Sequence, residues 1–345
     1  MVTLRDLEAA LATALETAGR GHRGANPLVG ACILDQDGNL IATGYHLGAG
    51  HPHAEVDALR RLGTLSSATA RTLTMVVTLE PCNHTGRTGP CAKAIADAGI
   101  GTVYYAVSDN TAASGGAEYL RSRGITTHRL DDDAAARTLN HRWFLSKKQQ
   151  RPFITVKLAQ SLDARINAPD GTSQWITSEQ SRNHAHGLRS RVDGILVGTT
   201  TALVDNPRLS ARTKDGQLHS KQPYRLVMGH RELPSTLDLI RGDDWEQIKT
   251  HDVHEVIQRA NELGLAHLLI EGGATVASAF IEADLADELY CYQAPLLIGA
   301  GSSSVNLPTT TLSQAHRYRL DTASNESLAR LGEDIMLHLE PLPRA

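Results

Sequence analysis

The spacing of hydrophobic positions in the first part of the chain changes repeatedly between a helical repeat and short apolar runs typical of buried strands. Over residues 3–20, leucine and alanine recur at helical spacing, so one face of a helix is apolar there. Further helices are expected at 53–62, 91–99 and 117–124, and strands at 28–35, 40–46, 73–80 and 102–109. Strands separated by helices of this length predict a layered α/β domain with parallel strand pairs.

The same alternation resumes after a polar stretch, SKKQQRP, at 146–152. Five of its seven residues are charged or amide-bearing and it ends in proline, so we interpret it as a linker between two domains, 1–146 and 151–345. Residues 211–222 are expected to form a polar loop. Strands are then expected at 153–161, 193–198, 224–229 and 267–273, and helices at 178–190, 252–263 and 274–283. These elements predict a second α/β domain.

Composition narrows the class of protein. The length of 345 residues agrees with two domains of ~100–200 residues each, and 41% hydrophobic residues is ordinary for a globular chain. A net charge of −4 argues against a protein built to bind nucleic acid or an anionic membrane, and no apolar stretch approaches the length of a membrane span. Four cysteines fit a reducing compartment, so we expect a cytoplasmic protein, with Cys32 and Cys291 as inert core residues.

His53, Cys82 and Cys91 form a candidate metal site. Zinc binds imidazole nitrogen and thiolate sulfur, and a catalytic zinc site keeps one position open for water. Pro90 would open the helix that carries Cys91, and a thiolate at a helix N-terminus is favoured by the helix dipole. Glu55 is too close in sequence to His53 to be a convenient fourth ligand. It can instead move the protons of the bound water, whose pKa zinc lowers to roughly 7.

The order HAE and then a proline-preceded cysteine pair is typical of zinc-dependent nucleobase deaminases, but eight residues separate the cysteines here rather than two. This longer form resembles the deaminase half of the bifunctional riboflavin-biosynthesis deaminase/reductases. The segments that carry the resemblance are, in order, NPLVG (26–30), GYH (44–46), PHAE (52–55) and PCNHTGRTGPC (81–91). The resemblance implies a cytidine-deaminase-like zinc domain in which Glu55 is catalytic.

The second domain has no G-x-G-x-x-G after a strand and therefore no standard Rossmann site. The paired glycines at 272 and 273 could bring backbone amides to a phosphate, but such a turn alone is more often structural. Five segments in order resemble the reductase half of the same family: KLAQSLDAR (157–165), SQWITS (173–178), RSRVDGILVG (189–198), LVDNPRLSAR (203–212) and EGG (271–273). The resemblance implies a dihydrofolate-reductase-like domain that uses NADPH.

Residue by residue, the resemblance implies contacts to substrate and cofactor. Substrate contacts in the deaminase half are Asn26, His46, His84, Arg87 and Asp109. The forked guanidinium of Arg87 suits phosphate, although a solvated loop charge is the alternative. Substrate contacts in the reductase half are Ser173, Arg189, Leu209, Arg212 and Glu271. Cofactor contacts are Gln160, Trp175, Thr201, Asp205, Gly273, Ala274 and Thr275, with a core aromatic as the alternative for the tryptophan.

Three places depart from the family pattern. Asn110 and Thr111 stand where the family usually has proline and asparagine, and Ala164 replaces a glycine. Gly229 and His230 stand where the family often has aspartate and a serine that touches the cofactor. These departures fall on positions that contact substrate and cofactor in the family. They bear on affinity and on the choice between NADPH and NADH, but not on the zinc chemistry.

Lys157 is a second catalytic candidate. It lies in the strand expected at 153–161 and should point opposite to Val156 and Leu158. A lysine there is seldom placed for packing, the alternative being an edge-strand lysine that snorkels to solvent. The reduction implied by the resemblance opens a sugar ring before hydride arrives, so negative charge develops on the ring oxygen. A cation would stabilise that charge, with Glu271 as the orienting partner.

The resemblance thus implies a bifunctional enzyme with zinc and NADPH, and a homo-oligomer acting on a small phosphoribosyl pyrimidine. It would deaminate diaminohydroxyphosphoribosylaminopyrimidine and then reduce the ribosyl group of the product to ribityl. Two alternatives remain open at this point. A nucleic-acid-editing deaminase would need a basic groove and usually the shorter cysteine spacing. A structural zinc site would close the fourth position, for which His84 is the nearby candidate, and would leave Glu55 without a role.

Overall fold

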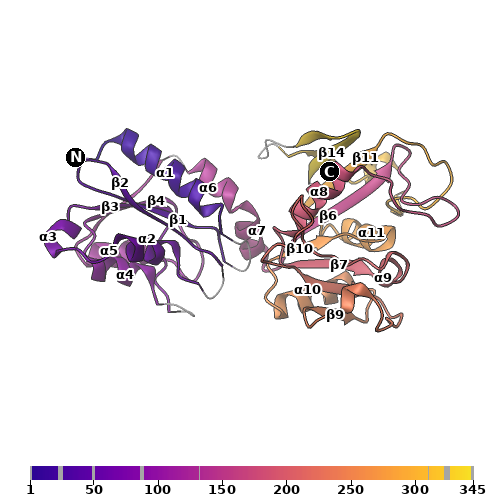
Figure 1. The fold of residues 1–345 in the computed structure, drawn as a ribbon, viewed down its shortest axis with the longest axis horizontal. Helices are drawn as coiled ribbons and strands as arrows, with labels where there is room; N and C mark the ends of the chain where they lie inside the picture. The colour runs from indigo at the N-terminus through magenta and orange to yellow at the C-terminus, as the bar shows by residue number, and fades with distance from the viewer. Residues whose placement is uncertain are drawn as a thin grey trace. The chain divides into compact units, whose positions relative to one another are not determined.

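The computed structural model describes residues 2–21, 26–48, 51–85, 89–131, 133–309, 311–321 and 327–342 of the chain. They form two compact units, Met1–Lys147 and Lys148–Ala345 (Figure 1). Each unit has its own sheet. The first unit has one hydrophobic core, and the second has two. The two alternating patterns of the sequence therefore build two separately packed α/β units.

The first unit is a five-stranded sheet in the order β2-β1-β3-β4-β5. Its strands are β1 (Gly30–Leu34), β2 (Leu40–Tyr45), β3 (Thr74–Leu79), β4 (Thr102–Val107) and β5 (Thr126–Arg129). Strand β1 runs antiparallel to β2 and β3, whereas β3, β4 and β5 are parallel to their neighbours. The helices are α1 (Leu4–Ala18), α2 (Ala54–Leu62), α3 (Ser67–Ala70), α4 (Cys91–Ala98), α5 (Gly116–Ser122), α6 (Ala134–Leu139) and α7 (His141–Gln149).

Local sequence explains where helix α1 begins and which face it buries. The Thr3 side chain accepts a hydrogen bond from the Asp6 backbone N–H, and the Asp6 carboxylate accepts one from the Thr3 backbone N–H. This reciprocal capping box satisfies two N–H groups that a helix start leaves unpaired. Leu7 and Leu11 lie on the apolar face, which is buried in the same core as β1 and β3. The helix expected over 3–20 is confirmed.

A glycine in β2 lets helix α2, which carries Glu55, lie directly on the sheet. A Cβ atom at Gly44 would lie 2.2 Å from the Ala58 backbone nitrogen and 2.3 Å from the Ala54 carbonyl oxygen. Gly44→Ala should therefore displace α2 and lower the stability of the first unit by about 1–3 kcal/mol, measured by thermal denaturation. Gly187→Ala is the control, because no atom lies within 4 Å of a Cβ built there. An unchanged melting temperature for Gly44→Ala would contradict this close packing.

The prediction of a linker at 146–152 is wrong for residues 146–149, which are helical. Helix α7 continues to Gln149, and Phe144 packs against the core of the first unit. Lysine and glutamine are good helix formers, so a polar composition fits an exposed helix as well as it fits a linker. The boundary between the two units follows Lys147, inside this helix.

The second unit is a nine-stranded sheet in the order β12-β14-β11-β6-β10-β7-β8-β9, with β13 paired to β14. Strand β14 is antiparallel to its partners, and the other pairs are parallel. Its strands are β6 (Phe153–Ser161), β7 (Gly194–Gly198), β8 (Tyr224–Met228), β9 (Trp245–Ile248), β10 (His267–Ile270), β11 (Glu288–Ala294), β12 (Tyr318–Leu320), β13 (Leu328–Leu331) and β14 (Asp334–Pro341). Its helices are α8 (Glu179–Arg189), α9 (Thr199–Asp205), α10 (Val253–Glu262) and α11 (Ala274–Glu282), with 3₁₀ turns at Asp238–Ile240 and Leu312–Gln314.

Alternate residues of the central strands enter two cores, one on each face of this sheet. One core contains side chains of α10 and α11, and the other contains side chains of α8 and α9. On β6, Val156 and Leu158 belong to the first of these cores. The Lys157 ammonium lies over the ring of Tyr292, which belongs to the second. The prediction that Lys157 points opposite to its apolar neighbours is therefore confirmed.

Candidate active sites

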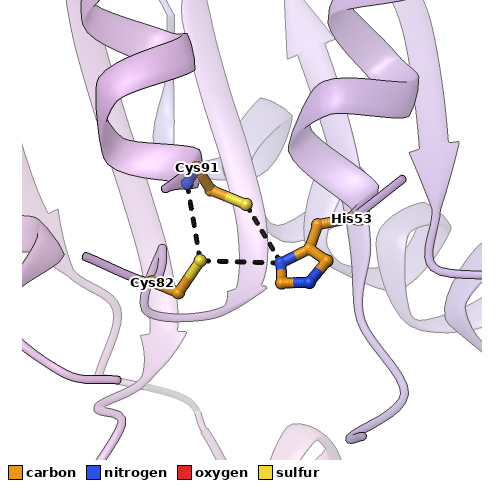
Figure 2. A group of neighbouring side chains, drawn as sticks. All are labelled: His53, Cys82 and Cys91. Atoms are coloured by element: carbon orange, nitrogen blue, oxygen red, sulfur yellow. Dashed lines mark hydrogen bonds between the residues drawn. The ribbon is translucent and has the colours of Figure 1, made fainter. Parts of the chain in front are cut away.

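His53, Cys82 and Cys91 lie together in the first unit, where helices α2 and α4 begin (Figure 2). His53 is the N-cap residue of α2, and Cys91 is the first residue of α4, whose N-cap is Pro90. The Nδ1 atom of His53 lies 3.5 Å from the Cys82 sulfur and 3.2 Å from the Cys91 sulfur. The three candidate ligand atoms all lie within 4.8 Å of one another. A single ion can therefore contact all three.

The two cysteines differ in acidity because they share a hydrogen bond. The hydrogen bond from Cys91, opposed by burial and assisted by His53, lowers the pKa of Cys82 to about 4. The backbone N–H of Cys91 also donates to the Cys82 sulfur at 3.4 Å. The shared hydrogen bond and burial raise the pKa of the Cys91 thiol. A thiolate, a thiol directed at it and an imidazole form a soft donor set that fits zinc, which would replace the shared proton.

Glu55 is a buried acid in the first turn of α2, beside this set. Burial is the main cause that raises the pKa of its carboxyl, and the negative charge of Cys82 raises it further. Among the residues that the structure describes, the group able to hold an ion contains neither Glu55 nor His84. This arrangement argues against the alternative of a structural zinc site, which would need a fourth protein ligand.

A cavity of about 430 Å³ adjoins the candidate ligands. The residues expected to act in the deaminase half that line it are Asn26, His46, His53, Glu55, Cys82, His84 and Asp109. Arg87 lies outside the described residues. Thr111, one of the departures from the family pattern, also lines the cavity. Sequence reasoning missed three further polar or aromatic side chains that line it: Glu80, Trp143 and Lys147.

Hydrogen bonds fix the orientation of His46 in the cavity wall. Its Nδ1 lies 3.0 Å from the carbonyl oxygen of Pro52, so this nitrogen carries the proton and donates. Its Nε2 lies 2.9 Å from Asn26 Nδ2 and accepts from that amide. Burial is the main cause that lowers the pKa of His46, in agreement with a neutral ring. Among the described residues, none donates a hydrogen bond to Asn26 Oδ1, so this side-chain oxygen can accept one from a ligand.

Glu80 organises the loop that carries Asp109. Its carboxylate accepts hydrogen bonds from the backbone N–H groups of Asp109 at 3.2 Å and Ala117 at 3.1 Å. The Asp109 carboxylate in turn accepts from the Thr111 backbone N–H at 2.8 Å. This turn needs only a backbone N–H at position 111, so the departure from the family pattern there leaves it intact. No local sequence pattern singles out Glu80, because its partners lie 29 and 37 positions away.

In the second unit, Lys157, Arg189 and Glu271 converge from three separate segments. Arg189 Nε and Nη2 donate to the two oxygens of Glu271 at 2.6 and 2.8 Å. Burial opposes ionisation of Glu271, but the charge and hydrogen bonds of Arg189, with a further effect of Lys157, hold its pKa at about 2. Burial lowers the pKa of Lys157, against the opposing charge of Glu271. The Lys157 Nζ lies 5.8 Å from the centre of the Tyr292 ring.

Arg212 lies beside this charge cluster. Its Nε donates to the Ser210 hydroxyl at 3.0 Å, while Arg189 Nη1 donates to the Ser210 carbonyl at 3.2 Å. Ser173, also expected on the substrate side, donates to the carboxylate of Asp205 at 3.1 Å. The structure thus joins one expected substrate residue to one expected cofactor residue.

The turn after β10 packs closely against helix α9. A Cβ atom at Gly272 or Gly273 would lie 3.3 or 3.2 Å from Thr201 Oγ1, and Gly273 has a φ of +57°. Ala274 and Thr275 follow as the first residues of α11. The N-terminus of a helix presents backbone N–H groups that suit phosphate. Two segments expected on the cofactor side therefore meet, at a turn whose glycines let a backbone approach closely.

Trp175 is 68% exposed, so the alternative that it is a core aromatic is wrong. The Arg182 guanidinium lies 4.5 Å from the centre of its ring. Gln160 is half-buried near the end of β6, in register with Gln293 of β11. Among the described residues, no hydrogen bond joins either side chain to Thr201.

Backbone conformation bears on two departures and on one expected substrate residue. Ala164 has a φ of +59°, in the left-handed region that favours the glycine found in the family. Gly229 has a φ of +127°, and a Cβ there would lie 2.9 Å from Thr199 Oγ1. A glycine is therefore required here where the family often has aspartate. Leu209, expected to contact the substrate, has a φ of +52°, and its side chain is buried in the core that contains side chains of α8 and α9.

Comparison with known families agrees with this division. Residues 4–107 match the cytidine and deoxycytidylate deaminase zinc-binding region, and residues 152–333 match the RibD C-terminal domain. Fold and site thus define a zinc-dependent deaminase joined to a reductase in one chain. Cys32 and Cys291 are buried and unpaired in disulfides, as expected for core cysteines.

Relatives match over nearly the whole chain. Riboflavin biosynthesis protein RibD of Corynebacterium ammoniagenes is 42% identical over 311 residues, which cover 88% of this chain and 90% of that protein. The RibD of Escherichia coli is 33% identical over 368 residues, covering 95% and 98%. A solved structure of Acinetobacter baumannii RibD has a TM-score of 0.87 and 30% identity, covering 99% and 100%. The chain belongs to the RibD family of bifunctional riboflavin-biosynthesis enzymes.

A deaminase/reductase structure from Thermotoga maritima is also similar, with a TM-score of 0.85 and 26% identity over 98% of this chain and 99% of that one. That protein is named diaminohydroxyphosphoribosylaminopyrimidine deaminase/5-amino-6-(5-phosphoribosylamino)uracil reductase. Within the described residues, every helix is too short or too polar to cross a membrane.

Proposed function

We propose that the first unit hydrolytically deaminates diaminohydroxyphosphoribosylaminopyrimidine and that the second reduces the ribosyl group of 5-amino-6-(5-phosphoribosylamino)uracil to ribityl with NADPH. The observation that carries the proposal is the partly buried set of His53, Cys82 and Cys91 beside Glu55, at a cavity of about 430 Å³. The family relationship and the charge cluster of Lys157 support the reductase assignment.

For deamination, His53, Cys82 and Cys91 would hold zinc, whose Lewis acidity lowers the pKa of a bound water to roughly 7. Glu55 takes a proton from the attacking water and delivers protons to the amino group, which leaves as ammonia. Asn26, oriented by the neutral His46, holds the pyrimidine edge by a hydrogen bond. The burial of Glu55 excludes bulk water from these proton transfers.

For reduction, the C–O bond of the ribose ring breaks and the nitrogen lone pair forms a C=N bond. NADPH supplies the hydride that reduces the carbon of that bond. Lys157 stabilises or protonates the departing ring oxygen, and the Arg189–Glu271 pair holds the lysine and the substrate hydroxyls. Thr201 and the turn at Gly273 would hold the cofactor phosphates, which suit the N–H groups at the start of α11.

The test is turnover of the pyrimidine substrate, followed by absorbance with and without NADPH. Without NADPH, the purified enzyme should release ammonia and accumulate the deaminated pyrimidine. With NADPH, the cofactor should be oxidised in step with that product. Release of ammonia without any later oxidation of NADPH would contradict the reductase half of the proposal.

Removal of one thiolate should remove both the metal and the first activity. We expect Cys82→Ser to lose most of its zinc and its deaminase activity, because a hydroxyl is a poor replacement for a thiolate that is ionised at neutral pH. Zinc per chain is measured by elemental analysis. Cys291→Ser is the control, since Cys291 is buried in the other unit and should keep zinc. Full zinc retention in Cys82→Ser would contradict the ligand assignment.

We also propose that the enzyme is a cytoplasmic homo-oligomer that binds no nucleic acid. The resemblance to the family supports the oligomer, and the net charge of −4 argues against nucleic acid as a partner. Light scattering during size-exclusion chromatography and an RNA-binding assay at physiological salt test these two statements.

A further inference from the structure

Helix α7 is fixed to the wall of the deaminase cavity at its start. Asn140, directly before the helix, is buried and makes two hydrogen bonds with the backbone of Leu28. The Leu28 N–H donates to Asn140 Oδ1 at 2.9 Å, and Asn140 Nδ2 donates to the Leu28 carbonyl at 2.8 Å. The residues on either side of Leu28, Pro27 and Val29, line the cavity. The start of α7 is therefore tied to the segment that forms the cavity wall.

The same helix contributes two side chains to the cavity. Trp143 and Lys147 both line it, and they are four positions apart on one helix face. The Lys147 Nζ lies 5.9 Å from the centre of the Trp143 ring, within the range of a cation–π contact. Lys147 is exposed although it lines the cavity, so its ammonium lies at the mouth. The next residue, Lys148, is exposed and is not part of the lining.

The charge balance of the cavity calls for a cation. Three carboxyl side chains line it, those of Glu55, Glu80 and Asp109. Among the described residues that line the cavity, Lys147 is the only lysine, and none is an arginine. A phosphate binds best to donors that carry positive charge. A phosphorylated substrate entering this acidic cavity therefore finds a matching charge at the mouth, in Lys147.

We propose that Lys147, held over the ring of Trp143, binds the phosphate group of the deaminase substrate at the mouth of the cavity. The inference rests on the proposed deaminase function and adds a contact outside the motifs that carry the family resemblance. It makes α7, part of which was expected to be a linker, a component of the substrate site. Arg87, expected to face the same arm of the substrate, lies outside the described residues.

The test compares Lys147→Ala with Lys148→Ala in the full-length, zinc-loaded enzyme, using the phosphorylated substrate and the same compound after phosphatase treatment. Lys147→Ala should raise KM for the phosphorylated substrate about tenfold, with kcat changed by less than about twofold, because the lost contact is remote from the reacting carbon. KM for the dephosphorylated compound should stay unchanged. Lys148→Ala should behave as the wild type with both compounds.

Two results would overturn the inference. One is a KM of Lys147→Ala for the phosphorylated substrate within about twofold of the wild-type value. The other is an equal rise of KM for both compounds, which would indicate a structural effect rather than a phosphate contact. Failure of the proposed function looks different, because the wild-type enzyme would then release ammonia from neither compound, and the inference would fall with it.

Discussion

Glu55→Gln is expected to bind zinc as the wild type does and to deaminate its substrate about 10²–10⁴-fold more slowly. Among the described residues, the group that could hold the ion is His53, Cys82 and Cys91, without Glu55. Loss of the Glu55 carboxylate should therefore not release the metal. Glutamine keeps the size and polarity of the buried side chain but cannot accept a proton from water or pass one to the leaving amino group. Ammonia release and zinc content of the purified variant are the two measurements.

Two controls separate a chemical role of Glu55 from a structural one. The reductase residues belong to the other unit, so oxidation of NADPH with the deaminated intermediate supplied directly should be unchanged in Glu55→Gln. Glu8→Gln, an exposed position on α1, should keep full deaminase activity. A Glu55→Gln enzyme that deaminates at the wild-type rate would rule out proton transfer by this residue.

Local pattern predicted many of the elements that are strongly apolar or well capped, and missed several that depend on distant partners. Strand β11 was missed although it is buried along most of its length. The strand at 153–161 was predicted with the bounds that the structure has, because its residues are apolar and it follows a proline. Strand β5 and strand β9 were not predicted, since each has four residues and little buried apolar surface. Strand β14 also went unpredicted, although its inward residues alternate with exposed ones. Its stability comes from pairing with β11, whose paired residues lie 42 to 50 positions earlier.

The candidate sites show the same division. The candidate metal ligands could be predicted from sequence because zinc chemistry restricts which residue types can act, and proline and helix starts mark their positions. Lys147 and Glu80 could not be predicted in this way, because lysine and glutamate are common on surfaces and only the fold places these two side chains in the cavity wall. Arg189 and Glu271 were expected near the substrate, but their ion pair joins positions 82 apart and needed the fold.

Lys157→Met should leave deamination intact and remove most reductase turnover, by about 10²-fold or more. The lysine is half-buried on β6, near the ionised Glu271 and over the ring of Tyr292. These contacts do not fit a lysine that extends its ammonium freely into solvent. In the proposed mechanism, this cation stabilises the negative charge that develops on the departing ring oxygen. Methionine is also unbranched, is one heavy atom shorter than lysine, and lacks the charged, proton-bearing ammonium group.

The measurement is NADPH oxidation with the deaminated intermediate supplied directly, so that the first activity has no influence. NADPH binding, followed by fluorescence, should be unchanged in Lys157→Met, and Lys214→Met in the exposed polar loop should be fully active. Because burial lowers the pKa of Lys157 and the cationic form acts, wild-type turnover should fall as pH rises through a value below the ordinary lysine range. If Lys157→Met oxidises NADPH at the wild-type rate, the charge is not used in the reaction and the lysine serves only the fold.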